Sequence, residues 1–425
     1  MQGALDQPAR RWLLVGGMLL TATYLAAVSL QLIATRYSSS HTLRSVRRAA
    51  RLDPLNAAYA FQIGERELVE GQSPARAMAW LERATALNPH RAQYWLVRAL
   101  ASQSFGDIGG EEASLQQALS VDPRTPDVAW QAANLYLAQG SQDLAMKEFR
   151  VVLENDASLA SGAIQTCWKV RPDVDFLLRE VIPPAAQISF LDFLISRNEN
   201  GASARVWDEI IASHQKIGRS HLFDYIRHLL ARRETEQAVR VWQQAAEAAD
   251  LQAYQPSSQN LIVNGNFSLK ILNAGFDWIH QKTPGVNLAL DPNETHSSPR
   301  SLRITFDGAG MEDAGIRQII AVEPDRTYEF SAFYKAQEMD GAGGARFTIQ
   351  DLYRETRLYV SDDLGNADFW KKISGRFTTA HDTRLVMLKI AREPPGSPIR
   401  GRLWIDALQL ASADGALASR AGENH

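Results

Sequence analysis

The sequence is poor in cysteine, because Cys167 is the only one among 425 residues. No disulfide can therefore form within the chain, and no zinc site built from cysteines is possible. An excess of charge is also missing, since 45 lysines and arginines stand against 48 aspartates and glutamates. A protein that binds nucleic acid usually has a basic face and a high isoelectric point, so we expect no nucleic-acid partner.

Sequence motifs for catalysis are absent as well. The chain contains no G-x-S-x-G, H-E-x-x-H or phosphate-binding P-loop motif, and its 9 histidines lack the spacing of metal ligands. Gly341 to Gly344 lie between two predicted strands and open no helix, so they are expected to form a hairpin loop. These absences predict a protein that is not an enzyme.

One long uncharged run is present, from Leu13 to Ala34. A helix of this length reaches across the roughly 30 Å hydrocarbon core of a bilayer. Residues 13–35 are therefore predicted to form a single transmembrane helix after a short tail, residues 1–12. A cleaved signal peptide is the alternative, but its apolar region is usually shorter, and no A-x-A cleavage site follows.

Arginines near this run give two opposite indications of its orientation. Arg10 and Arg11 precede it and favour a cytoplasmic N-terminus. Arg36 follows it, and a predicted helix just beyond carries further arginines, which together favour a cytoplasmic body. The arginines of that helix are candidates for contact with anionic lipid head groups, and a solvated helix face is the alternative. They are Arg44, Arg47, Arg48 and Arg51.

The middle of the chain has a helical pattern that is interrupted by turns at regular intervals. The intervals are 35, 34 and 34 residues, between Asp53-Pro54, Asn88-Pro89, Asp122-Pro123 and Asp156-Ala157. This period, with Trp95 and Trp130 early in the first helix of a pair, resembles the tetratricopeptide repeat. The resemblance implies such repeats over residues 41–157.

A weaker form of this repeat pattern continues to residue 255. The segments around Trp207 and Trp242 lie 35 residues apart, so residues 158–255 are expected to hold diverged, degenerate repeats. Repeats of this family stack into an all-α solenoid with a concave face. The resemblance therefore implies that this face binds a protein partner.

The pattern changes to short alternating runs after a linker at residues 256–259. Glycine, proline, asparagine and aspartate separate these runs, which predicts an all-β sandwich over residues 260–411. Residues 412–425 are expected to form a flexible tail.

The start of the sandwich, Asn260 to Phe267, reads NLIVNGNF and resembles the opening of jelly-roll carbohydrate-binding modules of the galactose-binding-like superfold. SLRITF, TYEFSAFYKA, FWKKISGRFT and WIDALQL follow in the order of that family. The resemblance implies a jelly roll that binds polysaccharide. Family members often hold calcium through acidic residues after the opening phenylalanine and in the last strand. Ser268 and Asp406-Ala407 stand there, so we expect no cofactor and keep a structural calcium as the weaker alternative.

Sugar ligands need aromatic faces for stacking and planar polar groups for hydroxyls. Strand alternation places some candidates on the polar faces of strands, and others lie in predicted loops or at sheet edges. The candidate residues are Phe333, Gln350, Tyr353, Tyr359, Trp370 and Lys389. For each aromatic residue, packing within the domain is the alternative.

Together these features predict a multidomain bacterial protein with a transmembrane helix, a helical solenoid and a β-sandwich. We expect a non-enzymatic scaffold of the inner membrane, single-pass, with a periplasmic body, since a glycan-binding domain has more to bind there. A role in the assembly of exopolysaccharide or cell-surface polysaccharide follows from the two resemblances. The alternative is a protein–protein assembly factor whose sandwich binds no sugar.

Overall fold

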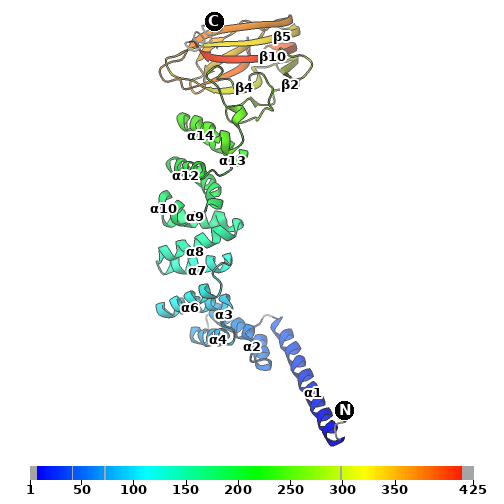
Figure 1. Ribbon diagram of the computed structural model, residues 1–425, viewed down its shortest axis with the longest axis vertical. Helices are drawn as coiled ribbons and strands as arrows, with labels where there is room; N and C mark the ends of the chain where they lie inside the picture. The colour runs from blue at the N-terminus through cyan, green and yellow to red at the C-terminus, as the bar shows by residue number, and fades with distance from the viewer. Residues whose placement is uncertain (1–6, 41, 71–72, 297–298, 414–425) are drawn as a thin grey trace, which may run out of the picture. The chain divides into compact units, whose positions relative to one another are not determined.

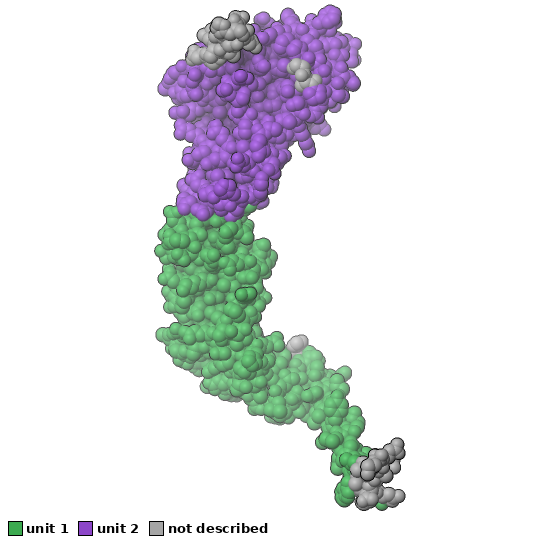
Figure 2. Space-filling model, in the orientation of Figure 1, with its two compact units in different colours: residues 1–194 green, residues 195–425 purple. Residues whose placement is uncertain are grey.

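The computed structural model describes residues 7–40, 42–70, 73–296 and 299–413 (Figure 1). The predicted tails lie outside the described residues, apart from residues 7–12 and 412–413. The chain divides into two compact units, residues 1–194 and 195–425 (Figure 2). Helices form the N-terminal part and two antiparallel sheets the C-terminal part, as the sequence predicts.

The apolar run lies in the first helix, α1 (Gln7–Ser38). Within the described ranges, α1 is the one helix that is long and apolar enough to cross a membrane. The hydroxyl groups of Thr21, Thr23 and Ser29 donate to backbone carbonyls one turn earlier in α1. Such internal hydrogen bonds satisfy polar groups where no water is available, and this supports a membrane span.

The C-terminal end of α1 packs against the next two helices. Ala34 is fully buried beside Val46 and Ala49 of α2 (Leu43–Leu52) and Ile63 of α3 (Ala57–Val69). Ser38 Oγ donates to Gln62 Oε1 of α3 over 3.1 Å. α1 is thus joined to the helices that follow by packed side chains as well as by the chain.

The helices that follow end where the sequence predicts turns. Asp53, Asn88, Asp122 and Asp156 are the C-caps of α2, α4, α6 and α8. Neighbouring helices pack as α3 with α4, α5 with α6 and α7 with α8. The bounds of the remaining helices are α4 (Pro74–Leu87), α5 (Ala92–Ser104), α6 (Ile108–Val121), α7 (Pro126–Ala138), α8 (Gln142–Asn155), α9 (Ala160–Val170), α10 (Val174–Glu180), α11 (Gln187–Ser196), α12 (Asn200–Ala212), α13 (Arg219–Ala231) and α14 (Thr235–Ala248).

The strands form two five-stranded sheets that enclose one core. Sheet A has the order β1-β4-β9-β6-β7, and sheet B has the order β2-β3-β10-β5-β8. The strand bounds are β1 (Ile279–His280), β2 (Val286–Asp291), β3 (Ser301–Gly310), β4 (Asp313–Ala321), β5 (Thr327–Asp340), β6 (Ala345–Asp351), β7 (Arg357–Val360), β8 (Ala367–Thr378), β9 (Leu385–Arg392) and β10 (Pro398–Ser412).

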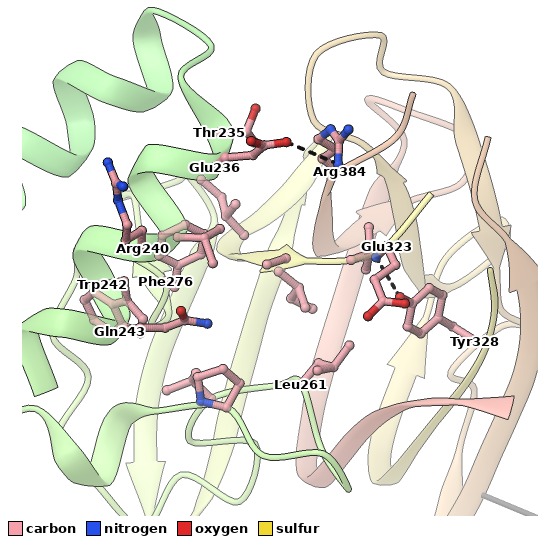
Figure 3. A pocket seen from close by; sticks show the side chains of 17 residues that line it. Thr235, Glu236, Arg240, Trp242, Gln243, Leu261, Phe276, Glu323, Tyr328 and Arg384 are labelled. Carbon is pink, nitrogen blue, oxygen red and sulfur yellow. Dashed lines mark hydrogen bonds and ion pairs between the residues drawn. The ribbon is translucent and has the colours of Figure 1, made fainter. Parts of the chain in front are cut away.

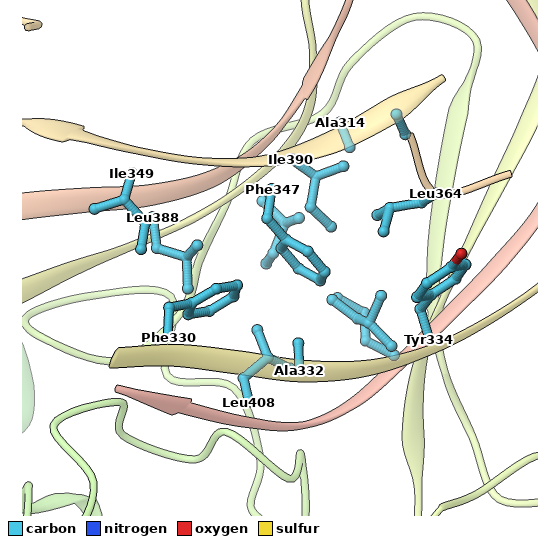
Figure 4. Close-up of a cluster of buried hydrophobic side chains, with 14 of the residues drawn as sticks. Ala314, Phe330, Ala332, Tyr334, Phe347, Ile349, Leu364, Leu388, Ile390 and Leu408 are labelled. Atoms are coloured by element: carbon cyan, nitrogen blue, oxygen red, sulfur yellow. The ribbon is translucent and has the colours of Figure 1, made fainter. Parts of the chain in front are cut away.

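Alternate residues of the strands fill the core between the sheets (Figure 4). Phe330 of β5 meets Phe347 of β6 edge to face, with ring centroids 5.3 Å apart. The opening segment seals one side of this core, since Trp278 Nε1 donates to the carbonyl of Asn264 over 3.1 Å. A side chain at Gly265 would place its Cβ 2.3 Å from the carbonyl oxygen of Leu408, so this position requires glycine.

A fully buried arginine at the end of β9 holds two loops together. The Arg392 guanidinium donates to the carbonyls of Glu393, Ser397 and Pro398 after β9, at 3.2, 3.3 and 2.8 Å. It also donates to the carbonyl of Ala342 between β5 and β6 over 3.1 Å. Burial lowers the pKa of Arg392. One cation therefore satisfies four carbonyl groups at this end of the sandwich.

Candidate functional site

The structure divides the candidate sugar ligands between two opposite surfaces. Phe333 of β5 and Trp370 of β8 belong to sheet B, whereas Gln350 of β6 and Lys389 of β9 belong to sheet A. The inward-facing residues of these strands form the core, so all four candidates point outward by alternation. The two pairs therefore lie on opposite outer faces and cannot hold one sugar together.

The two tyrosines among the candidates have other contacts. The Tyr359 ring packs toward the core, 5.6 Å from the Phe330 ring. The Tyr353 hydroxyl donates to the carbonyl of Leu230 in α13 over 2.9 Å, and the Arg233 guanidinium lies 5.2 Å from its ring. Burial raises the pKa of Tyr353. Both tyrosines are therefore held by contacts within the chain.

The outer face of sheet B is covered by its own side chains. His296, in the loop between β2 and β3, stacks on Phe333 with ring centroids 3.7 Å apart, and its ring meets Trp370 at 5.8 Å. Lys335 pairs with Glu294 over 2.7 Å in the same region. The stacked histidine takes the face of Phe333 that a sugar ring would need.

Further polar groups on this face are also paired. Asp291 Oδ2 accepts hydrogen bonds from Trp404 Nε1 over 3.0 Å and from Arg303 over 3.1 Å. The Trp404 hydrogen bond is the main reason that the pKa of Asp291 is lowered. The polar groups around Phe333 and Asp291 are therefore engaged within the chain.

The outer face of sheet A carries a row of polar side chains across three strands. The residue pairs Arg317–Lys389 and Lys389–Thr348 place three polar side chains in one row across β4, β9 and β6. Gln350 lies two residues along β6 from Thr348, on the same face. Among the described residues, these four side chains have no hydrogen-bonding or ionic partner. Thr348 and Gln350 are buried, at 1% and 6% exposed, whereas Arg317 is exposed and Lys389 is half-buried.

The two cations of this row can pair with an acidic ligand. Arg317 and Lys389 add two unpaired positive charges. The outward positions of β4, β9 and β6 between Arg317 and Ala321, Leu385 and Ala391, and Arg346 and Gln350 include no acidic residue.

Comparison with protein families is decisive for this part of the chain. Residues 259–395 match the model of a family described as a carbohydrate binding domain. The C-terminal sandwich is thus similar to carbohydrate-binding domains, as the sequence predicts, and this similarity supports polysaccharide binding by the sandwich. A comparison with curated proteins found no match.

Solved structures show weaker likenesses. One described as "CBM4 structure and function" is 17% identical and covers 36% of this chain and 99% of that chain, with a TM-score of 0.28. "Crystal structure of MamA" is 21% identical and covers 34% and 86%, with a TM-score of 0.27. The Clostridium thermocellum xylanase 10B CBM22-1–GH10 modules with xylohexaose are 15% identical and cover 37% and 29%, with a TM-score of 0.26. These likenesses are too weak to indicate a function.

The places where the module resemblance implies calcium do not fit that ion. The carbonyl of Ser268 accepts a hydrogen bond from the Arg300 guanidinium over 2.6 Å. Both oxygens of Asp406 accept backbone hydrogen bonds, from His296 over 2.9 Å and from Ala407 over 2.7 Å. Calcium takes six to eight oxygen ligands, and an arginine and two amide groups already donate hydrogen bonds to the oxygens at these two places.

The arginines of α2 differ from one another in their surroundings. Arg47 forms an ion pair with Glu67 of α3, whose side chain is fully buried. Arg44, Arg48 and Arg51 are exposed, and Arg48 lies 5.9 Å from the ring of Tyr37 near the end of α1. Three of the four candidates thus remain available for lipid contact, beside the helix that can cross a membrane.

Sequence reasoning missed Arg317 and His296. Arg317 lies in GIRQII, which alternates as β4 does, so its outward position could have been predicted from the run itself. No local signal could have identified His296, because it reaches Phe333 from a loop 37 residues earlier in the chain.

Proposed function

We propose that this protein is a membrane-anchored, non-enzymatic scaffold whose carbohydrate-binding module binds an acidic polysaccharide. The observation that carries the proposal is the pair of neighbouring cations on sheet A, Arg317 and Lys389, which have no partner among the described residues, in a domain that matches a carbohydrate-binding family. Arg317 and Lys389 would pair with carboxylate groups of the glycan.

Affinity gel electrophoresis of the full chain in a non-ionic detergent tests this proposal. We expect alginate, a linear polyuronate, to retard the protein, and dextran, a neutral glucan, to leave its mobility unchanged. Added salt should weaken the retardation, because it screens exposed charges. Retardation by a neutral glycan but not by alginate would mean that the protein binds a glycan and that this glycan is not acidic. Equal mobility in every gel would favour an assembly factor whose sandwich binds no sugar.

The helical part supports the second half of the scaffold proposal. Its turns recur about every 34 residues and coincide with helix ends, as in tetratricopeptide solenoids. We assign to it a protein partner on its concave face, and to the sandwich the jelly-roll form. Exopolysaccharide or cell-surface polysaccharide assembly is the proposed setting, because it brings together a membrane, a glycan and partner proteins.

The proposed place is the inner membrane, with one span and a periplasmic body. α1 supports the span, and the glycan-binding module supports the orientation, since polysaccharides of this kind lie outside the cytoplasm. Arg47 is neutralised by Glu67, which reduces the positive charge that argues for a cytoplasmic body. A C-terminal fusion to a reporter enzyme that is active only outside the cytoplasm tests this orientation.

The packing of α2 against α1 predicts contact with anionic lipid. In nanodiscs that contain phosphatidylglycerol, we expect slower amide hydrogen exchange in α2 than in nanodiscs of phosphatidylcholine alone. Replacing Arg44, Arg48 and Arg51 with alanine should remove this difference, since each arginine near an anionic surface contributes about 1 kcal/mol. Hydrogen exchange measured by mass spectrometry checks the prediction.

The matched control replaces Arg76 and Arg83 of α4 with alanine. These arginines are exposed but lie on a helix that does not pack against α1, so the lipid-dependent difference in α2 should persist. The same exchange of α2 in both lipids would contradict lipid contact and favour the solvated helix face.

A further inference from the structure

A cavity of about 430 Å³ lies in the second unit, between α14 and β4 (Figure 3). Ligand sites in proteins commonly have volumes of this size. Val239 and Trp242 of α14 line one side, and β4 with the next residue lines the other from Ile319 to Val322. Four consecutive residues alternate between the two faces of a sheet. The cavity therefore runs along the edge of β4 and not over one face.

This edge of β4 has no neighbouring strand along the cavity. β9 pairs with β4 as far as Ala321 on one side, whereas β1 on the other side pairs only with Ile316 and Arg317. The Val322 N–H donates to the Arg384 carbonyl on the β9 side over 2.9 Å. Hydrogen bonds alternate in direction along an antiparallel strand, so Ile319 and Ala321 direct their N–H and C=O groups toward the cavity.

The backbone groups of Ile319 and Ala321 have no partner on the cavity side within the ranges that the structure describes. An open row of N–H and C=O groups at strand spacing is the template on which an extended peptide pairs. We propose that this cavity binds an extended, uncharged peptide segment of a partner protein, which adds to sheet A beside β4. This surface is separate from the glycan-binding row and from the helical concave face.

The charged side chains at the rim of the cavity favour an uncharged peptide. Glu236 pairs with Arg384 over 3.4 Å (Figure 3). Glu323 pairs with Arg326, and Arg240 donates to the side chain of Gln237. The charged groups at the rim thus have partners within the chain. A neutral peptide complements them, because it leaves these pairs intact.

The aromatic side chains that line the cavity are not placed to bind a sugar. Trp242 and Tyr328 are each 2% exposed. Trp242 Nε1 donates to the carbonyl of Tyr254 over 3.2 Å, and the Tyr328 hydroxyl accepts a hydrogen bond from the Glu323 N–H over 2.7 Å. Their rings therefore offer no open face for stacking on a sugar ring. Apolar side chains of a peptide, at alternate positions, would pack beside Val239 on one face and Val322 on the other.

Selection from a phage library of random octapeptides tests the proposal with the full chain in detergent. The Ala321→Pro variant serves for counter-selection, in which peptides that also bind the variant are discarded. The Ala321 N–H points into the cavity, so proline removes a pairing group without removing a bond to β9. We expect uncharged peptides with alternating apolar residues to be enriched on the wild-type protein. N-methylation of alternate amides on their pairing edge should weaken binding at least tenfold, since each lost backbone hydrogen bond contributes to affinity.

A second variant tests the helical wall of the cavity and leaves β4 unchanged. Val239→Lys places a charge on the helical wall and should also weaken binding at least tenfold, whereas Leu144→Lys, an exposed helical position in α8, should not change it. The proposal is overturned if no peptide is enriched, or if the enriched peptides tolerate N-methylation and both cavity variants. Concentration-dependent dimerisation that Ala321→Pro abolishes would assign this edge to a second copy of the chain, and would overturn the peptide as its occupant.

Discussion

Replacing Arg317 and Lys389 together with alanine is expected to weaken alginate binding about a hundredfold. Lys389 is half-buried, and a hydrogen bond to a charged group contributes about 1.5–3 kcal/mol. Arg317 is exposed, so its contribution is closer to 1 kcal/mol. Their sum corresponds to roughly two powers of ten in the dissociation constant. Dissociation constants from affinity gels at several alginate concentrations measure the change.

The matched control is Lys372→Ala on β8. Lys372 is an exposed lysine on the outer face of sheet B, 6.0 Å from the ring of Phe333. This substitution removes a similar charge from the opposite surface, so alginate binding should change less than twofold. A larger loss with Lys372→Ala than with the double variant would place the glycan on sheet B, beside Phe333 and Trp370.

Gln350→Ala separates recognition of hydroxyl groups from attraction of charge. The Gln350 amide carries no charge and is only 6% exposed, so its loss should weaken binding by at most about 1 kcal/mol and leave the salt dependence unchanged. The double variant of Arg317 and Lys389 should instead lose most of the salt dependence. Thus the two measurements distinguish a built glycan site from general attraction between a basic surface and a polyanion.

Helix ends and strand faces could be predicted from the sequence because their signals are local. Asp53, Asn88 and Asp122 precede proline or a proline-containing turn, and each ends a helix. The alternation in TYEFSAFYK likewise places Tyr328, Phe330, Ala332 and Tyr334 on one face of the strand, and all four are buried. Such features depend on residues within one turn of helix or one strand.

The assignment of each strand to a sheet could not be predicted in this way. β5 and β6 are consecutive in the chain, yet β5 pairs with β10 and β8, whereas β6 pairs with β9 and β7. The polar faces of the two strands consequently lie on opposite surfaces of the domain. Phe333 and Gln350 therefore both qualify as candidates by alternation within their own strands, although they lie on opposite surfaces.

The positions of the two candidate tyrosines also depend on distant residues. Tyr353 is held by the Leu230 carbonyl, more than 100 residues earlier in the chain. Gly375 leaves room for the Tyr359 ring, since a Cβ there would lie 2.1 Å from it. Neither contact leaves a signal near the tyrosine in the sequence. An aromatic residue in a loop-like segment is therefore weak evidence for a ligand until its neighbours are known.

Arg392→Met should destabilise the sandwich by several kcal/mol, because a buried carbonyl group that loses its donor costs about 1–3 kcal/mol. Methionine has a similar length but no donors, so four carbonyl groups would lose their shared partner. The loops at Ala342 and at residues 393–398 would then lose the group that joins them. Hydrogen exchange measured by mass spectrometry on the full chain should show faster exchange in both loops first, and then in β9 and β10.

Arg402→Met is the control for loss of an arginine in the same sheet region. Arg402 is half-buried on β10, pairs with Glu338 over 3.1 Å and lies over the Trp404 ring at 5.8 Å. An ion pair near the surface contributes at most about 1 kcal/mol, so this variant should retain nearly wild-type protection in both loops. Arg392→Lys should be intermediate, because a single ammonium group keeps the charge but cannot reach four carbonyls at once. Equal protection in Arg392→Met and the wild type would mean that water replaces the guanidinium, and that the loops are held by their own backbone hydrogen bonds.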